Sequence, residues 1–263
     1  MKNVKLIVAT HKKFQMPKDS ELYIPIHVGR EGKPDIGYIG DNTGDNISKL
    51  NPYYCELTGL YWAWKNLDYD YLGVVHYRRY FTSSSKRYHD GTIIDDVILN
   101  KEQVNSLLEQ SDVIVPKKRR YYIETLYSHY DHTLDGSHLD KAREIIAEIS
   151  SEYLKSYDKV MRQRSGYMFN MFIMRKELVD SYLTWLFQIL DKLYENVDMS
   201  NYTPFEARLY GRVSELLFNV WLDKNEITPK EVPFMYMENI NLLKKGTSFL
   251  QAKFMGKKYG KSF

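Results

Sequence analysis

The sequence predicts an α/β fold that is completed by a mostly helical second half. Short apolar runs alternate with segments of helical periodicity in the first half. In the second half the helical pattern is interrupted by one apolar run, 167–174. Of 263 residues, 43% are hydrophobic and 27% charged, which is the balance of a globular protein and excludes a disordered chain.

Strands are expected where apolar, β-branched runs are bounded by turn formers. The runs that meet this description are Val4–Thr10, 23–28, Tyr71–His76 and 112–116. Leu72, Val74 and Val75 leave no polar face in the third run, so this strand is predicted to be buried on both sides.

Helices are predicted from periodicity and from capping signals. The predicted ranges are 51–64, 100–110, 139–148, 176–195 and 203–222. Asn51 followed by Pro52 is typical of a helix start, since proline suits the first helical position. Thr203 and Glu206 have the spacing of a capping box at the start of the last helix.

The chain is expected to be a single domain, 1–263, with an α/β half over about 1–120, a helical half over about 121–240 and a basic tail over 241–263. No acidic residue follows Glu238, and the tail carries six lysines, so the tail has a net charge of +6 and the rest −3. Two interpretations of the tail stay open: contact with an anionic membrane surface, or a solvated terminus.

The location expected from the sequence is the cytoplasm, with or without peripheral contact with the cytoplasmic membrane. Cys55 is the single cysteine, which excludes a disulfide framework and fits a reducing compartment. No run approaches the roughly 18 apolar residues that a membrane span needs.

Positively charged side chains follow the strand Tyr71–His76. His76, Arg78 and Arg79 come at its carboxyl end, where open α/β sheets bind their ligands. The guanidinium fork suits phosphate oxygens, so an anionic ligand is predicted here. The alternative is that the arginines form ion pairs with neighbouring helices.

Asp68 and Asp70 have the spacing of a metal-binding carboxylate pair, but they precede the strand rather than follow it. They are therefore expected in a turn at the opposite edge of the sheet. No metal is predicted, because His76 and the two arginines stand where a divalent cation would be held.

A loop over 37–46 is dense in turn formers. Asp41, Asn42 and Asp45 could contact ligand hydroxyls, or the loop could be inert. Glu56 begins the following helix, where the helix dipole also favours a carboxylate.

The segment 127–132 contains residue types that bind metals. His129 and His132 are three residues apart and could share a helical face with Asp131 close by. Acceptor contacts or a surface cluster are the favoured interpretations, and a metal hydrolase is an alternative. The basic run 117–122 is better explained by a phosphate-bearing substrate than by nucleic acid, since no nucleic-acid motif accompanies it.

Several motifs occur in the order typical of one family. They are GDNTGDNIS from Gly40, YCELT from Tyr54, YWAWKN from Tyr61, HYRRYF from His76, NMFIM from Asn170, WLF from Trp185, and the late Arg208, Gly211, Ser214, Glu215 and Trp221. The chain thereby resembles the bacterial capsular and exopolysaccharide glycosyltransferases that carry the HYRRYF signature.

This resemblance implies a variant GT-A fold, Rossmann-like and able to bind a nucleotide sugar. It also implies transfer of a hexose from a UDP-sugar to a growing capsular, exopolysaccharide or O-antigen glycan, lipid-linked or free. Galactose is the expected hexose, with galactofuranose as one form. The expected partners are thus a UDP-hexose and a glycan acceptor, with no cofactor, no metal and no nucleic acid.

Roles follow for individual residues. His76, Arg78 and Arg79 are expected to stabilise the departing diphosphate, while Ala9, Thr10 and His11 form the uridine pocket. Asp41, Asn42 and Asn170 are further expected donor contacts, with Asn170 buried within an apolar run. The catalytic base is one of four carboxylates, which are Asp41, Glu56, Asp131 and Glu215. A non-catalytic nucleotide-sugar or carbohydrate-binding module remains the alternative function.

Overall fold

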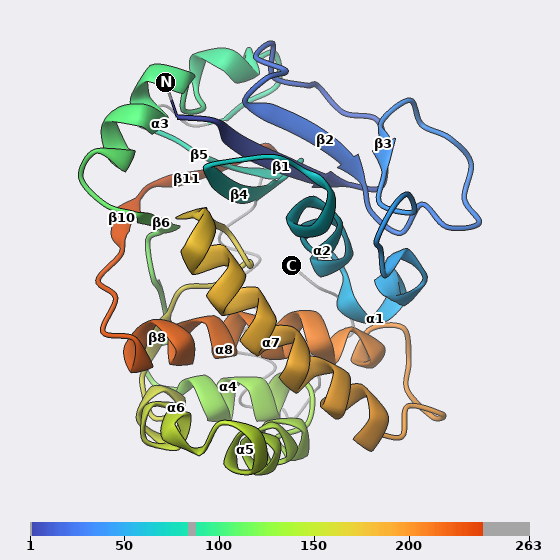
Figure 1. The fold of residues 1–263 in the computed structure, drawn as a ribbon, viewed down its shortest axis with the longest axis vertical. Coiled ribbons are helices and arrows are strands. Elements are labelled where there is room, and N and C mark those ends of the chain that lie inside the picture. Colours follow the sequence, from blue (N-terminus) through green and yellow to red (C-terminus); the bar gives the residue numbers. More distant parts are fainter. Residues whose placement is uncertain (1, 84–87, 239–263) are drawn as a thin grey trace.

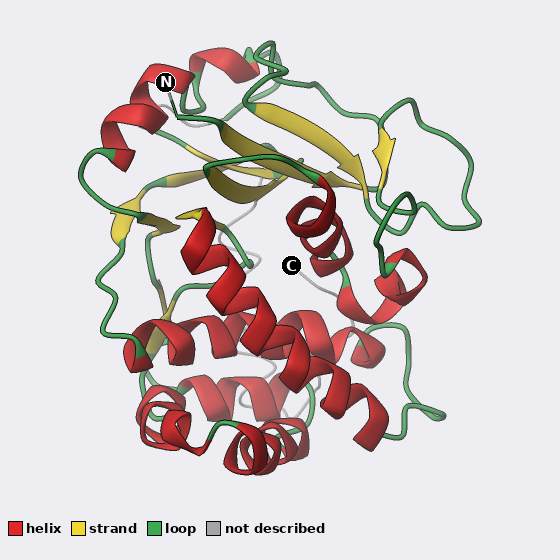
Figure 2. Cartoon of the chain, in the orientation of Figure 1, coloured by secondary structure: helices red, strands yellow, loops and turns green. Residues whose placement is uncertain are grey.

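The computed structural model describes residues 2–83 and 88–238. Figure 1 shows a twisted sheet built mainly from the first half of the chain, with most helices of the second half gathered below it. Figure 2 shows the same arrangement by element type, with most helices below the strands and a smaller helical group above them. The predicted tail, 241–263, lies outside the described residues.

The strands of the main sheet follow the order β10-β6-β9-β4-β1-β2-β3, and β5 pairs with β4 and β11. Their bounds are β1 (Val4–Thr10), β2 (Tyr23–His27), β3 (Ile39–Gly40), β4 (Tyr71–His76), β5 (Arg79–Phe81), β6 (Val113–Pro116), β9 (Phe172–Arg175), β10 (Lys230–Val232) and β11 (Phe234–Tyr236). A two-stranded ribbon is formed separately by β7 (Arg119–Arg120) and β8 (Ser165–Gly166).

The register of β1 fixes the edge of the sheet where a ligand would bind. This strand runs parallel to both β2 and β4, and Ala9 lies between Ile26 and His76. β9 is antiparallel to its neighbours β4 and β6. The carboxyl ends of β1, β2 and β4 therefore meet at one edge, as the general rule for open α/β sheets requires.

Most helices lie below the sheet and build the second half (Figure 1). Their bounds are α1 (Asn51–Tyr54), α2 (Leu57–Asn66), α3 (Lys101–Leu108), α4 (Leu126–Thr133), α5 (Ser137–Ile149), α6 (Leu154–Met161), α7 (Lys176–Asn196) and α8 (Leu209–Lys224). Of these, α3 lies above the sheet in this view. α7 contacts β4 and β9 as well as α5 and α8, so it joins the sheet to the helical layer (Figure 1).

The predicted strands Val4–Thr10 and Tyr71–His76 have the expected bounds. The backbone leaves the regular region in two places, and in the first of them a prediction was wrong in detail. The helix expected over 51–64 is broken at Cys55, whose φ is 54°. The apolar run 167–174 is a strand only from Phe172 onward, since Phe169 and Asn170 have φ of 77° and 51°.

The capping signals predicted helix starts correctly. Asn100 and Gln103 exchange both bonds of a capping box before α3. Thr203 and Glu206 also bond to each other as expected, although a 3₁₀ turn, Glu206–Arg208, precedes α8. Neither α4 nor α6 was among the predicted helix ranges, because helices this short give a weak periodic pattern. No helix within 2–83 and 88–238 is long and apolar enough to cross a membrane.

Asp41 ties together three segments and has a structural role, which corrects its expected place among the ligand contacts. Its buried carboxylate accepts hydrogen bonds from the backbone N–H groups of Gly29 at 2.7 Å and Arg30 at 3.0 Å. It also accepts from the hydroxyls of Ser48 at 2.5 Å and Thr58 at 2.6 Å. Both oxygens are thus occupied, and the carboxylate holds the loop 37–46 against α2.

Asp41→Ala should lower the free energy of unfolding by about 3 kcal/mol, because four donors would lose a charged acceptor in a buried site. Urea unfolding followed by circular dichroism measures this change. Asp45→Ala is the matched control, since Asp45 is exposed in the same loop and should cost less than about 1 kcal/mol. Equal losses in the two variants would contradict the structural role.

Candidate active site

A cavity of about 810 Å³ lies between the carboxyl edge of the sheet and the helical half. One end is lined by the ends of β1 and β4 with α1, and the other by α4, α8 and the segments before them. The predicted site residues that line it are Ala9, Thr10, His11, Glu56, His76, Arg78, Arg79 and Glu215. Residues distant in the sequence thus meet where the sheet edge was expected to bind a ligand.

Five candidate residues do not line this cavity: Asp41, Asn42, Asp45, Asp131 and Asn170. Asp131 accepts a hydrogen bond from the backbone N–H of Gly136 at 2.8 Å and so holds the connection between α4 and α5. Asp68 and Asp70 lie at the opposite edge, as predicted, where the Asp70 carboxylate and the Asp68 carbonyl bond Asn3 just before β1.

The cavity wall carries an excess of positive charge. Its cations are Lys33, Arg78, Arg79, Arg119, Arg208 and Arg212, and its carboxylates are Glu56 and Glu215. Six cations against two carboxylates favour an anionic ligand of more than one charge. A divalent cation would be repelled by the same wall, and the described residues contain no group of three or more His, Cys, Asp and Glu side chains that could hold a metal ion.

Arg79 is the cation most deeply placed. Its guanidinium lies over the rings of Phe169 and Tyr236, with Cζ at 4.5 and 5.6 Å from their centroids. The buried Nε has no hydrogen-bond partner, and no carboxylate of the described residues lies within ion-pair distance. Desolvation lowers the pKa of Arg79, yet a guanidinium stays charged in proteins. A buried, unpaired cation is costly unless a ligand neutralises it.

Arg78 lies two residues beyond β4 and is exposed. It is 3.7 Å from the carboxylate of Glu238, and its guanidinium lies 5.2 Å from the ring of Tyr77. Such an exposed, long ion pair contributes little to stability, so Arg78 can turn to a ligand at small cost.

His76 is not the cation that the sequence suggested. Its Nε2 lies 2.7 Å from the carbonyl oxygen of Phe169, and since a carbonyl only accepts, this nitrogen carries a proton. Burial lowers the pKa of His76 below its usual value, against a smaller opposing effect from Glu56. The imidazole is therefore neutral at pH 7, and the positive charge at this edge comes from the arginines.

Phe169 and Asn170 form a backbone kink that contacts three titratable groups of the cavity. The Phe169 carbonyl accepts from His76, and its N–H donates to Glu215. The Asn170 side chain donates to Glu56 at 2.7 Å and to a backbone carbonyl at 3.0 Å, and accepts from Ser214 at 2.9 Å. Asn170 is thus satisfied by protein groups, so the expected ligand contact is replaced by a positioning role.

Glu56 and Glu215 are the two carboxylates that face the cavity. Burial raises the pKa of Glu215, and the charge of Glu56 raises it further. Arg212, the N–H of Phe169 and Arg79 oppose this shift. The carboxyl group of Glu215 therefore holds its proton more tightly than an exposed glutamate does, which suits a group that exchanges a proton with a ligand.

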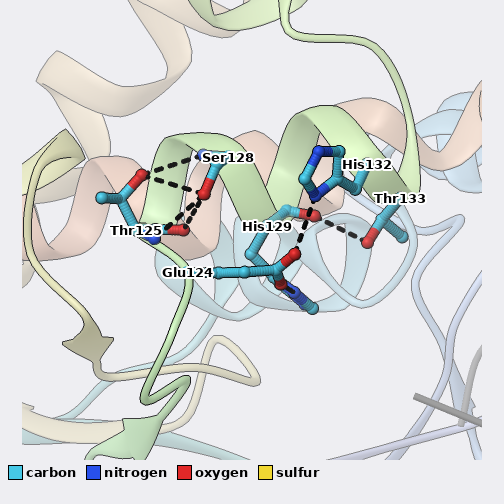
Figure 3. A network of polar contacts seen from close by, with 6 residues as sticks. All are labelled: Glu124, Thr125, Ser128, His129, His132 and Thr133. Carbon is cyan, nitrogen blue, oxygen red and sulfur yellow. Dashed lines mark hydrogen bonds and ion pairs between the residues drawn. The ribbon is translucent and has the colours of Figure 1, made fainter. Parts of the chain in front are cut away.

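A second polar network lies beside the helical end (Figure 3). The buried carboxylate of Glu124 accepts from Nδ1 of His129 at 2.9 Å and from Nδ1 of His132 at 2.7 Å. These bonds lower the pKa of Glu124 although its desolvation acts the other way. The two histidines share a face as predicted, but they hold a carboxylate that the sequence analysis did not select.

His129 and Tyr121 connect this network to the cavity, since both line it and their rings are 4.1 Å apart. Burial lowers the pKa of His129, and Arg119 and Arg212 contribute to the lowering. Acceptor contacts at this end, expected for the segment 127–132, are consistent with His129 and Tyr130 in the wall.

Arg208 and Arg212 were not selected as site residues, although their spacing is a usable signal. Together with Glu215 they stand at positions i, i+4 and i+7, which places all three on one face of a helix. Arg208 donates its Nε–H to the sulfur of Cys55 at 3.1 Å. Burial raises the pKa of Cys55 to about 11, so this sulfur is a neutral thiol.

Comparison with solved structures finds a chain described as the bifunctional glycosyltransferase WbbM in its apo form. The TM-score is 0.84 and the sequence identity is 33%, over 90% of this chain and 46% of the WbbM chain. This chain therefore spans less than half the length of that protein. The likeness confirms the predicted fold class, an α/β sheet of glycosyltransferase type with a mostly helical second half.

No curated protein matches the sequence. A family model described as a domain of unknown function, DUF4422, matches residues 5–226, which include every strand and helix that lines the cavity. The chain is a member of the DUF4422 family.

Proposed function

We propose that this protein is a glycosyltransferase that transfers a hexosyl group from a nucleoside diphosphate sugar to a glycan acceptor. The likeness to a bifunctional glycosyltransferase supports the reaction class, and the position of the cavity beyond the carboxyl ends of β1 and β4 supports a nucleotide donor. The proposed donor is a UDP-hexose, with galactose or galactofuranose as the sugar. The proposed acceptor is a growing capsular, exopolysaccharide or O-antigen glycan.

The observation that carries the proposal is the guanidinium of Arg79, which has no carboxylate of the described residues within ion-pair distance and whose buried Nε has no hydrogen-bond partner. It lines a cavity with excess positive charge together with the exposed Arg78. Rupture of the bond between the anomeric carbon and the phosphate oxygen leaves its electron pair on the diphosphate. Two fixed guanidiniums can stabilise that charge as it develops, which is the task that a bound metal performs in other enzymes.

The nucleoside is placed at the end of β1 in this proposal. Ala9, Thr10 and His11 line the cavity there, and the Thr10 hydroxyl donates to the carbonyl of Lys12 at 2.6 Å. That bond turns the chain away from the strand and leaves room beyond its end. Burial and the charge of Arg78 lower the pKa of His11, so it offers a neutral ring at pH 7.

The acceptor hydroxyl needs a base if the reaction inverts the anomeric centre. Glu56 and Glu215 are the base candidates that the cavity contains, and the other two of the expected four are engaged elsewhere. Asn170 fixes one oxygen of Glu56, so the amide acts as a positioning group for this pair.

Arg79→Gln should lower the rate of sugar transfer by about 10²–10³-fold, because one preorganised donor to the departing diphosphate is lost. Arg79→Lys keeps the positive charge but lacks the forked guanidinium, so its transfer rate should fall between those of the wild type and Arg79→Gln. Steady-state kinetics with a UDP-hexose measure both. Arg143→Gln is the matched control, since Arg143 is exposed on α5 and pairs with Asp158 far from the cavity. A rate for Arg79→Gln within threefold of wild type would contradict the assignment.

Glu215→Gln should unfold at a higher temperature than wild type at pH 7. A carboxyl group whose pKa is raised in the folded state binds its proton more tightly when the protein is folded. It therefore lowers the free energy of unfolding once the pH rises above the pKa of an ordinary glutamate. Glutamine does not ionise, so the variant does not lose this stability. The difference in melting temperature between the variant and the wild type should therefore shrink toward pH 4.5. Each kcal/mol of difference in the free energy of unfolding corresponds to about 2–4 °C.

The control for this measurement is Glu152→Gln, an exposed site that should show little difference at either pH. The same Glu215→Gln protein should transfer sugar slowly if Glu215 is the base, whereas normal transfer assigns that role to Glu56. A melting temperature below that of wild type at pH 7 would count against the buried-charge argument.

Release of UDP from UDP-galactose and related UDP-hexoses tests the function itself. The expected result is slow release without acceptor, faster release with a glycan acceptor, and no effect of EDTA. Activity lost in EDTA and restored by Mn²⁺ would refute the metal-free mechanism. UDP at 100 times its dissociation constant should stabilise the protein by about 2.7 kcal/mol, which a rise in melting temperature would report. If UDP bound in this way but no UDP-hexose were turned over, the protein would be a non-catalytic binding module instead.

A further inference from the structure

A basic segment with exposed apolar side chains lies beside the helical end of the cavity. Lys117, Lys118, Arg119 and Arg120 are consecutive and all exposed. Tyr122 and Ile123 follow, and their side chains are 76% and 53% exposed. This run continues into the site, because Arg119 and Tyr121 are part of the cavity wall.

The neighbouring segment that contains β8 adds more positive charge to this basic run. β7 pairs with β8, and the N–H of Tyr121 donates to the carbonyl of Arg164 at 2.8 Å. The guanidinium of Arg164 donates to the carbonyl of Tyr122 at 3.2 Å, and Arg162 is exposed two residues earlier. The one acid close in sequence, Glu124, is buried and already bonded to two histidines.

The apolar side chains at the tip are held outward by the backbone. Tyr122 has a φ of 57°, in the left-handed region, which costs a bulky residue roughly 1–2 kcal/mol. Burial of its ring in the protein does not offset this cost, because the side chain is largely exposed. A strained residue that presents an aromatic ring to solvent indicates a contact with something outside the chain.

We propose that residues 117–123, with Arg162 and Arg164, form a docking surface for an anionic lipid membrane. Consecutive cations complement the negative surface of such a bilayer, and an exposed tyrosine and isoleucine can enter its interfacial region. This surface belongs to the folded body and is separate from the tail 241–263.

The position of the docking surface bears on the acceptor, a point that rests on the proposed function. Arg119 and Tyr121 belong to both the surface and the cavity, so a bilayer bound at 117–123 would lie next to the helical end of the cavity. A glycan anchored in that bilayer would reach the two candidate catalytic bases, Glu56 and Glu215, from this end. The nucleotide would enter at the opposite end, beside β1 and β4.

Sedimentation of the full chain with vesicles of 70% phosphatidylcholine and 30% phosphatidylglycerol tests the docking surface. The wild type should bind these vesicles, bind less at high salt, and ignore pure phosphatidylcholine. Lys117→Gln/Arg120→Gln should weaken binding about 25-fold, since each basic residue near an anionic surface contributes about a factor of five. Tyr122→Ser/Ile123→Ser should weaken it as well by removing the apolar contact.

Two matched variants control for charge and apolarity. Lys18→Gln/Lys49→Gln removes two exposed cations elsewhere, and Ile39→Ser/Ile93→Ser removes the other large hydrophobic side chains of the described residues with comparable exposure. Both should bind vesicles as wild type does. Thermal unfolding confirms that each variant is folded.

The proposal would be overturned if the wild type did not bind the vesicles. It would also be overturned if the two variants of the segment 117–123 bound them as tightly as the wild type, and that result would point to the tail. Tighter binding to a single-stranded RNA oligonucleotide than to the vesicles, lost in the same variants, would overturn it too. The thermal shift with UDP should be unchanged in the segment variants. A protein that binds vesicles through 117–123 but neither binds nor turns over a UDP-sugar would refute the proposed function and leave the docking surface standing.

Discussion

The backbone kink at Phe169 and Asn170 is the constraint on which the site depends. Both residues lie in the left-handed region, at a cost of order 1–3 kcal/mol each, and they occupy the stretch just before β9. Their polar groups contact His76 on the sheet, Glu56 before α2 and Glu215 on α8. Three elements that are far apart in the sequence are thus held around one cavity by two residues.

The kink also explains why the buried charges are tolerated. Arg79 packs against the ring of Phe169, so the same residue that fixes His76 supplies an aromatic face for a guanidinium that pairs with no carboxylate in 2–83 or 88–238. Glu215 and Arg79 are each destabilised by burial, and each is partly compensated by the charge of the other. The site therefore stores unfavourable free energy, which the apolar layer between the sheet, α7 and α8 offsets.

The fold followed from local patterns, but the site depended on geometry that those patterns do not contain. The strands around His76 and the capping residues Asn100 and Thr203 were predictable because hydrophobic periodicity and hydrogen-bonding type act over a few residues. Asp41 was misassigned, since an aspartate in a polar loop such as 37–46 suits a ligand contact and an internal hydrogen-bond acceptor equally well. The neutral state of His76 was also beyond prediction, because it depends on the carbonyl of Phe169, 93 residues away.

The charge distribution limits how the two substrates can approach. In the proposed function a nucleoside diphosphate sugar would bring its negative charge to Arg78 and Arg79, and the two carboxylates would then lie on the far side of the sugar, away from the phosphate oxygens that would repel them. Glu56 and Glu215 share the cavity with these arginines and with a helical wall that contains His129 and Tyr130. Under that proposal an acceptor hydroxyl would meet this pair from the helical end, so that the donor and the acceptor would enter the cavity from opposite directions.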